Sequence, residues 1–456
     1  GSAGGFSSNI DLSSLNGSNG FKVSGELGGG ESGFSVASAG DINGDGIDDL
    51  ILGAPLAANK AGATYVVFGQ AGGSSSNIDL SNLNGANGFK INGASGDFSG
   101  FSVASAGDVN GDGYADIVIG AYGGANPPGA SYVVFGHAGG FASSINVSSL
   151  NGSNGFKLTG ATNGDETGLS VSSAGDINGD GYDDLIVGAP GADPHGSSSG
   201  ASYVVFGKAG GFHANVRLSS LNGANGFKLS GVAANDYSGF SVASAGDVNG
   251  DGFADLIVGA DEADPHGASS GASYVVFGKA GGFASNLDLS SLDGSNGFKL
   301  SGTAAGDYDG ASVASAGDVN GDGFADIIVS SRSADPNGNY SGASYVVFGK
   351  ASGFDANIDL SSLDGSNGFK LSGVAPFDFS GYSVASAGDL NGDGFADLII
   401  GASGANAGAA ASGASYVVFG QAPTEAVTRI GTDASQTLAG GNFDDTLSGL
   451  GGDDKL

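Results

Sequence analysis

Residues 33–55 read GFSVASAGDINGDGIDDLILGAP, and this stretch decides the fold. Two short runs with alternating apolar side chains, Phe34–Ala39 and Asp49–Gly53, flank a loop of Gly, Asp and Asn. Short apolar runs that are separated by turn-forming residues are typical of antiparallel β-strands. The stretch therefore predicts a pair of strands whose connecting loop is rich in carboxylates.

The same unit recurs along the 456 residues, and its acidic loop begins at Asp41, Asp108, Asp176, Asp247, Asp318 and Asp389. Each unit also contains the phrases Tyr-Val-Val-Phe-Gly and Asn-Gly-Phe-Lys, which in the first unit predict a third strand at Thr64–Phe68 and a fourth at Gly88–Ile91. Before the fourth strand lies Asn77–Leu83, which fits either a short helical turn or an extra edge strand. A repeat of about 70 residues with several short strands is typical of a β-propeller blade. We therefore expect an all-β protein, a β-propeller of six four-stranded blades.

The phase of the repeat bears on how the blades are completed. The chain begins with a fourth-strand phrase at Gly20–Val23, whereas the last unit ends on a third-strand phrase at Tyr416–Phe419. We expect the N-terminal strand to complete the last blade, because closure removes an open sheet edge. The alternative is an open array with capping ends.

The acidic loops have the composition of a calcium site. The first loop places Asp41, Asn43, Asp45 and Asp49 at positions one, three, five and nine, with the Ile47 carbonyl at position seven. Such a set of oxygen donors is what hard cations require, and calcium tolerates it better than the strictly octahedral magnesium ion does. The alternative is an Asx turn that uses Asp and Asn only for local hydrogen bonds.

All units keep the same positions, which predicts six calcium ions, one per loop. The remaining expected ligands are Asp108, Asn110, Asp112, Tyr114 and Asp116; Asp176, Asn178, Asp180, Tyr182 and Asp184; Asp247, Asn249, Asp251, Phe253 and Asp255; Asp318, Asn320, Asp322, Phe324 and Asp326; and Asp389, Asn391, Asp393, Phe395 and Asp397. Three converging carboxylates would repel one another without a cation, and this favours metal binding over the Asx turn.

The overall charge excludes some classes of partner. The chain has 47 acidic and 14 basic residues, a formal net charge of −33, and no Cys. Nucleic acid binding needs a basic surface, and an anionic membrane would repel this chain. No apolar run approaches the roughly 20 residues of a membrane-spanning helix. We therefore expect neither nucleic acid binding nor membrane insertion.

Residues 33–55 resemble the FG-GAP repeat of the integrin α-subunit propeller and its bacterial relatives. The resemblance covers roughly residues 1–421 and implies a propeller with calcium in the loop between the first two strands of each blade. The chain departs from the pattern where Phe34 is replaced by Leu169, Ala311 and Tyr382 in later units. Integrin propellers have seven blades, so this chain is either a six-bladed member or lacks a blade that lies outside it.

The composition changes after residue 421. Residues 422–430 form an expected linker, and residues 431–456 follow a nine-residue rhythm with Leu438, Leu447 and Leu456. The Gly- and Asp-rich phrases resemble RTX calcium repeats, which implies the start of a parallel β-roll, further calcium ions at Asp444, Asp445, Asp453 and Asp454, and a secreted bacterial protein. The alternative is an acidic Gly-rich linker.

No catalytic constellation is visible, so we expect no enzyme activity. Function collects on loops that a rigid scaffold holds, and the loops opposite the calcium end differ between units. The candidate contacts with a protein or glycan are His195, Asp261, Glu262, His266, Arg332 and Tyr340. The sequence thus favours a monomeric adhesion or interaction module of a larger secreted or cell-surface bacterial protein. A structural spacer or surface-layer segment is the first alternative, and part of a secreted hydrolase or lyase is the second.

Overall fold

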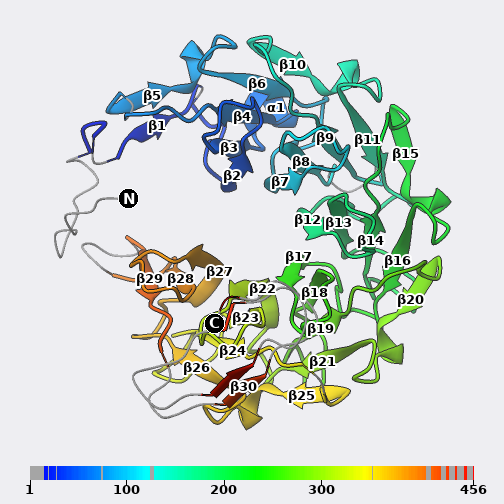
Figure 1. The fold of residues 1–456 in the computed structure, drawn as a ribbon, viewed down its shortest axis with the longest axis vertical. Coiled ribbons are helices and arrows are strands. Elements are labelled where there is room, and N and C mark those ends of the chain that lie inside the picture. Colours follow the sequence, from blue (N-terminus) through cyan, green and yellow to red (C-terminus); the bar gives the residue numbers. More distant parts are fainter. Residues whose placement is uncertain are drawn as a thin grey trace. The chain divides into compact units, whose positions relative to one another are not determined.

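The fold is described from a computed structural model (Figure 1). It describes residues 15–18, 20–26, 28–72, 75–123, 128–351, 353–406, 412–422, 428–430, 437–438, 446–448 and 455. The chain divides into two compact units, Gly1–Ser173 with Gly207–Ser220 and Ala174–Phe206 with Leu221–Leu456. In the described part of the chain, no helix has the length and apolar character needed to cross a membrane.

The predicted all-β fold of six propeller blades is confirmed. Each unit of the sequence forms an antiparallel sheet in chain order, and the first two blades consist of β2 (Val36–Gly40), β3 (Asp49–Ala54), β4 (Ala63–Val67) and β6 (Gly88–Asn92), and of β7 (Val103–Gly107), β8 (Asp116–Ala121), β9 (Ala130–Val134) and β11 (Gly155–Thr159). A one-turn helix, α1 (Ala57–Lys60), lies in the loop between β3 and β4. The expected strand positions in the first unit agree with these bounds to within two residues.

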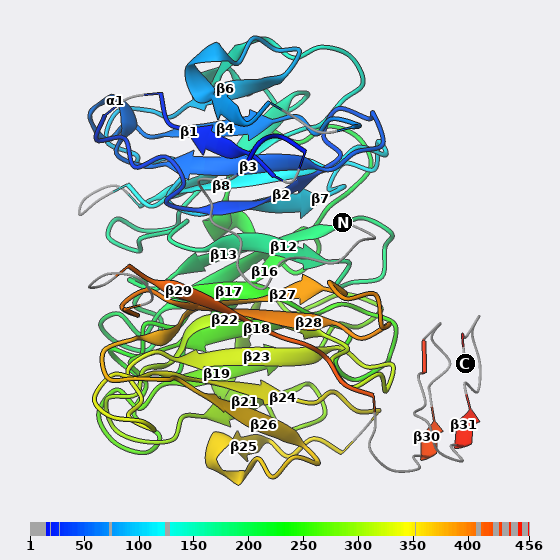
Figure 2. The same cartoon turned by 90° about the vertical axis from the view of Figure 1, so that its left-hand side faces the viewer.

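The later blades repeat this plan, and Figure 2 shows strands of the fifth blade running alongside one another. Their strands are β12 (Val171–Gly175), β13 (Asp184–Ala189), β14 (Ala201–Val205) and β16 (Gly226–Ser230); β17 (Ser241–Gly246), β18 (Asp255–Ala260), β19 (Ala272–Val276) and β21 (Gly297–Ser301); β22 (Asp309–Gly317), β23 (Asp326–Ser331), β24 (Ala343–Val347) and β26 (Gly368–Ser372); and β27 (Ser380–Gly388), β28 (Asp397–Ala402) and β29 (Ala414–Val418).

Four of the blades have five strands, which corrects the expectation of four. The segment for which the sequence allowed either a helical turn or an edge strand contains both, a short strand followed by a 3₁₀ turn. The strand pairs in parallel with the fourth strand of the preceding blade, as β10 does with β6 in the register Ile145↔Ile91. These strands are β5 (Asn77–Asp79), β10 (Ser144–Asn146), β15 (Asn215–Arg217), β20 (Asn286–Asp288) and β25 (Asn357–Asp359), and the turns are η2 (Leu80–Asn82), η3 (Val147–Ser149), η4 (Leu218–Ser220), η5 (Leu289–Ser291) and η6 (Leu360–Ser362).

The expected closure by the N-terminal strand is not seen among the described residues. The strand β1 (Lys22–Ser24) pairs in parallel with β5, in the register Val23↔Ile78, and the sheet of the last blade contains only β27, β28 and β29. β1 comes from the fourth-strand phrase, and each of the strands equivalent to β5, namely β10, β15, β20 and β25, also pairs with the fourth strand of a blade. The pairing of β1 with β5 therefore repeats the contact seen in the blades. Sequence phase alone indicated the missing strand of the last blade, but it did not reveal this parallel partner.

Phe side chains build the outer part of the core. In the third blade, Phe227 lies parallel to Phe283 with ring centroids 4.3 Å apart, and Phe206 lies 5.9 Å from Phe227. Phe227 is fully buried, whereas its equivalent Phe369 in the fifth blade is partly exposed and has a described ring contact only with Phe348. In the second to fifth blades the second strand belongs entirely to the core, since all residues of β8, β13, β18 and β23 are buried.

The described part of the tail contains β30 (Thr428–Ile430) and β31 (Thr446–Ser448), which pair in parallel. Arg429 faces Leu447, and Thr437 forms a parallel bridge with Lys455. Both pairs are separated by two nonapeptide lengths, a spacing that is compatible with a β-roll. The β-roll stays a prediction, and its expected ligands Asp444, Asp445, Asp453 and Asp454 lie outside the described residues.

Candidate functional site

Every acidic loop connects the first two strands of a blade and is wrapped around its position-one carboxylate. In the first loop, Asp41 Oδ1 accepts the N–H of Gly44 at 2.7 Å, and its Oδ2 accepts the N–H of Gly46 at 2.7 Å. Gly46 has a φ of 83°, a left-handed conformation that favours Gly. Asn43 and Asp45 accept N–H groups two residues ahead, at 2.9 Å each, as in Asx turns. Each of the six position-one Asp residues accepts loop N–H groups in this way.

The position-nine carboxylates have a different environment. Asp255 is fully buried, and its two oxygens accept the N–H groups of Val248 and Gly278 at 2.8 Å each. The carboxylate therefore ties the acidic loop to the end of the third strand. The same role recurs at Asp49, Asp116, Asp326 and Asp397, while Asp184 accepts the N–H of Ile177.

Burial makes these carboxylates costly to ionise. It raises the pKa of Asp116 to about 8, opposed by the hydrogen bond from Gly136 and reinforced by the charge of Asp112. Burial likewise raises the pKa of Asp49 to about 6 and that of Asp255 well above its ordinary value. A bound cation would offset this cost, because an opposite charge nearby favours the ionised form.

The donors present fit a hard cation. The Oδ1 atom of Asn110, at position three of the second loop, is buried and has no hydrogen-bond partner, as expected of an oxygen reserved for a metal. Within the described residues, however, no three Asp, Glu or His side chains are arranged as a ready metal-holding group. The carboxylates at positions one and five accept loop N–H groups instead, as do the position-three oxygens of Asn43, Asn178, Asn249 and Asn391. Each carboxylate oxygen nevertheless keeps a second lone pair. The six calcium sites therefore stay a prediction.

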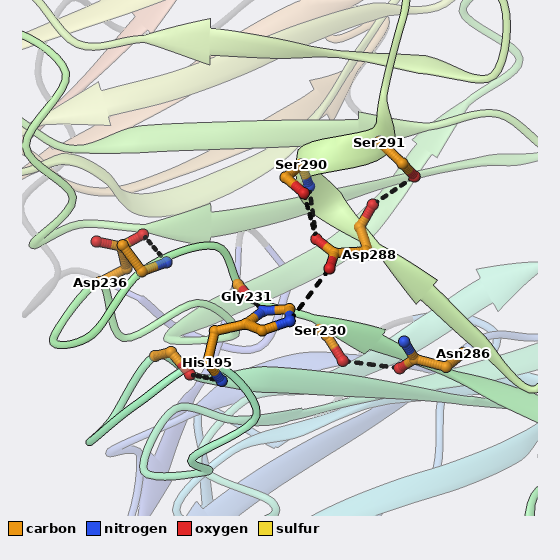
Figure 3. Close-up of polar contacts among 10 residues, drawn as sticks. His195, Ser230, Gly231, Asp236, Asn286, Asp288, Ser290 and Ser291 are labelled. Atoms are coloured by element: carbon orange, nitrogen blue, oxygen red, sulfur yellow. Dashed lines mark hydrogen bonds and ion pairs between the residues drawn. The ribbon is translucent and has the colours of Figure 1, made fainter.

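The loops at the other end of each blade contain the candidate contact residues, and Figure 3 shows the first of these, His195. Its Nδ1 lies 2.6 Å from the Gly231 carbonyl oxygen and its Nε2 lies 3.2 Å from Asp288 Oδ2. Against the opposing effect of partial burial, Ser290 and His195 hold the pKa of Asp288 below its ordinary value. His195 thus links the loop between β13 and β14 to β20, the strand that pairs with β16, and its ring is already engaged within the protein.

His266 repeats this arrangement one unit later, with Nδ1 2.6 Å from the Gly302 carbonyl and Nε2 3.4 Å from Asp359 Oδ2. The next unit has Asn337 at the same place, and its Nδ2 donates to the Gly373 carbonyl at 2.6 Å. A carbonyl can only accept, so Nδ1 of each His carries a proton, and Nε2 can donate to the carboxylate only in the imidazolium form.

Replacing both His195 and His266 with Asn, the residue at position 337, should remove the contacts with Asp288 and Asp359. We expect a loss of only roughly 0.2–1 kcal/mol for each pair, because these side chains are exposed or partly exposed. The loss should shrink at high salt, which screens exposed charge pairs. Thermal melts of both proteins at low and high salt check this, and an equal loss in both would contradict it.

Asp261 and Arg332 also contact each other. Arg332 Nη2 lies 3.4 Å from Asp261 Oδ2, and its guanidinium lies 5.8 Å from the Phe240 ring and 5.7 Å from the Tyr308 ring. Asp261 is almost fully buried, and burial raises its pKa to about 6 despite the Arg332 charge. Four of the six candidate contacts are exposed, namely His195, Glu262, His266 and Tyr340, whereas Arg332 is partly buried and Asp261 is buried.

Sequence inspection missed a second buried acid in the fifth blade. Asp309 faces Ser331 across β22 and β23, and the Ser331 hydroxyl donates to its carboxylate. The equivalent pair in the sixth blade is Ser380 and Ala402. Burial raises the pKa of Asp309 to about 7, although the Ser331 hydroxyl opposes this effect. Comparing the first strands of the repeats position by position could have found this residue.

Changing Asp309→Ser together with Ser331→Ala should stabilise the protein at pH 8 and have little effect at pH 5. The folded-state pKa of Asp309 is above that of an unfolded Asp, so its ionised carboxylate destabilises the fold. This destabilisation is fully present above pH 7 and disappears as the pH falls toward 4. We expect a gain of roughly 2–4 kcal/mol at pH 8. Melting temperatures at both pH values, with Ser380→Ala as the matched control, test this. A gain that does not depend on pH would contradict the assignment.

Comparison with known proteins agrees with the repeat structure. Six stretches match the FG-GAP repeat, at residues 32–67, 99–134, 167–205, 238–276, 310–347 and 380–418. Each stretch covers the first three strands of one blade together with its acidic loop. The chain is therefore an FG-GAP β-propeller protein.

Integrin α subunits are among its curated relatives. The chain is 36% identical to integrin alpha-5 of Xenopus laevis over 193 residues, which are 40% of this chain and 16% of that protein. It is 30% identical to integrin alpha-V of Gallus gallus over 236 residues, 50% of this chain and 20% of that protein. Integrin alpha-PS2 of Drosophila melanogaster is 29% identical over 274 residues, 57% of this chain and 17% of that protein. The matched segment is thus about a fifth or less of each of these relatives.

Proposed function

We propose that this chain is a calcium-stabilised extracellular propeller that serves as an adhesion or interaction module of a larger secreted or cell-surface bacterial protein. The observation that carries the proposal is the contrast between the two ends of each blade. All six acidic loops have the same residues at positions one, three, five and nine. The loops at the other end carry side chains specific to individual repeats, such as Glu262 and Tyr340.

The acidic end supports a scaffolding role for calcium. Each loop combines Asp and Asn oxygens with a buried position-nine carboxylate. Burial makes this carboxylate costly to ionise at Asp49, Asp116, Asp255 and Asp326, and the Asn110 oxygen has no other partner. Calcium would be held by the residues at positions one, three, five, seven and nine of each loop. It would supply the positive charge that lets these buried carboxylates stay ionised.

The opposite end supports binding to a protein or glycan. The integrin relatives point to recognition at a cell surface, and exposed side chains on a rigid blade are a common basis for it. The nonapeptide rhythm of the tail favours a secreted bacterial protein of the RTX type. We propose no catalytic role, because no nucleophile with an adjacent base emerges from the described loops.

A binding experiment tests the interaction function. The calcium-loaded chain would be applied to immobilised matrix proteins, a glycan array and cultured cells. The variant Glu262→Ala/Tyr340→Ser changes the two exposed candidates that take no part in the ion pairs described above, and Asn215→Ala on an outer strand serves as the control. We expect saturable binding that the loop variant weakens and the control preserves. Failure of the folded chain to bind any of these surfaces would contradict the proposal.

A structural spacer is the second candidate function, and one observation favours it. Four of the six candidate contacts are engaged within the protein, in the His195–Asp288, His266–Asp359 and Arg332–Asp261 pairs. Such contacts rigidify the blades without offering groups to a partner. A spacer would show no saturable binding, yet it would keep a large stabilisation by calcium.

A further inference from the structure

Three aromatic side chains gather where two loops next to strands of the fifth blade meet. Tyr340 lies in the loop between β23 and β24, and Phe377 and Phe379 lie in the loop between β26 and β27. The Tyr340 ring is stacked on Phe379 with centroids 5.6 Å apart, and it lies 5.9 Å from Phe377. Tyr340 is 44% exposed and Phe377 is 54% exposed. We call these three residues the aromatic patch.

The backbone holds the aromatic patch in place. The N–H of Phe377 donates to the Asn339 carbonyl at 2.8 Å, and the N–H of Phe379 donates to the Tyr340 carbonyl at 2.9 Å. Asp335 Oδ1 accepts the N–H of Tyr340 at 2.6 Å. The two loops are thus joined before any partner arrives, and such preorganisation lowers the ordering cost of binding.

The aromatic patch breaks the symmetry of the repeats. Tyr340 and Phe377 have left-handed φ values of 54° and 66°. Two repeats earlier in the sequence, the equivalent residues Ser198 and Asn235 have φ values of 48° and 67°. Asn tolerates this conformation well, whereas it is a strained outlier for a bulky aromatic residue. Large, exposed rings at strained positions indicate a function other than packing.

Other repeats show what covers such a ring. In other repeats, Phe98 and Tyr308 occupy the positions equivalent to Phe379. The Nζ atom of Lys60 lies 5.5 Å from the Phe98 ring centroid, and the guanidinium of Arg332 lies 5.7 Å from that of Tyr308. The chain therefore places a cation over this ring position twice.

In the described part of the chain, the aromatic patch has no cation of its own. The residue equivalent to Lys60 is Tyr340, and the residue equivalent to Arg332 is Ser403. Among the residues that the structure describes, no Lys or Arg lies over Tyr340, Phe377 or Phe379. The net charge of −33 also favours a positively charged partner.

We propose that the aromatic patch binds an Arg or Lys side chain of a protein partner. The cation would lie over the exposed rings, in a contact of the kind that Lys60 makes with Phe98. Asp335, which is exposed beside Tyr340, adds a negative charge at the edge of the aromatic patch. This inference rests on the proposed interaction function and specifies the chemistry of its ligand.

The test uses the full chain in calcium and a fluorescent peptide with two Arg residues separated by Gly and Ser. A second peptide carries citrulline, which has the shape of Arg without its charge. The variant Tyr340→Ser/Phe377→Asn introduces the residues that the chain itself has at positions 198 and 235, so its blades should fold. Asp355→Ser removes an exposed charge elsewhere and serves as the control. Fluorescence anisotropy gives the dissociation constants.

We expect binding to be at least tenfold weaker for the citrulline peptide and for the patch variant, and to change less than twofold for Asp355→Ser. Equal binding of both peptides would overturn the inference, because the positive charge would then play no part. Equal binding of the Arg peptide to both variants would overturn it in favour of attraction by overall charge. Loss of glycan-array binding in the patch variant, with no binding of the Arg peptide, would overturn it in favour of a sugar. Cell binding that the patch variant retains would sink this inference while leaving the proposed function standing.

Discussion

Calcium added to the chelated protein is expected to raise its melting temperature by roughly 10 °C or more, because each occupied site stabilises the fold by about 2.7 kcal/mol when calcium is at 100 times its dissociation constant. Six sites on one cooperative fold would contribute together. The physical source is the group of carboxylates in each loop, whose buried position-nine members Asp49, Asp116, Asp255 and Asp326 are costly to ionise without a cation. Calorimetry in calcium and in excess chelator measures the effect.

Two controls make this result specific. Magnesium at the same concentration should stabilise much less, because it demands octahedral geometry and keeps its waters. The variant Asp108→Asn/Asp112→Asn, which alters one loop, should lose about one site's share of the calcium-dependent stabilisation. A melt that does not respond to the chelator would contradict structural calcium and leave the Asx-turn interpretation of these loops.

Replacing Phe227 with Ala is expected to lower the free energy of unfolding by about 3–5 kcal/mol, the usual cost of removing a buried Phe side chain. Phe227 is fully buried and stacks on Phe283 at 4.3 Å, so the cavity has little opportunity to collapse. Denaturant unfolding monitored by Tyr fluorescence measures the loss. A cost below about 1 kcal/mol would contradict the packing that we describe.

The matched variant is Phe369→Ala, at the equivalent position of the fifth blade. Phe369 is partly exposed and has one described ring partner, Phe348, at 5.8 Å. We expect a smaller cost of about 1–2 kcal/mol, since less apolar surface returns to water. A cost equal to that of Phe227→Ala would mean that the outer face of β26 is covered in solution.

The repeat itself made much of this fold predictable. Alternating side chains and Gly-rich turns placed the strands of the first blade to within two residues, because strand formation there depends on local pattern. The acidic loops were also predictable, since alternate Asp and Asn residues favour Asx turns in any tertiary setting. The parallel strand β10 was not predictable in this way, because its partner β6 lies in the preceding unit and no local signal specifies it.

For the candidate sites, the sequence by itself determined which residues are repeated and which are specific to one unit. Only the tertiary structure decided what they contact. His195 and Asp288 are far apart in the chain, yet Nε2 and Oδ2 lie 3.2 Å apart. Tyr340 and Phe379 meet because two loops are joined by backbone hydrogen bonds. The reason is physical: local pattern fixes the backbone conformation, whereas the partner of a side chain depends on which segments the packed blades bring together.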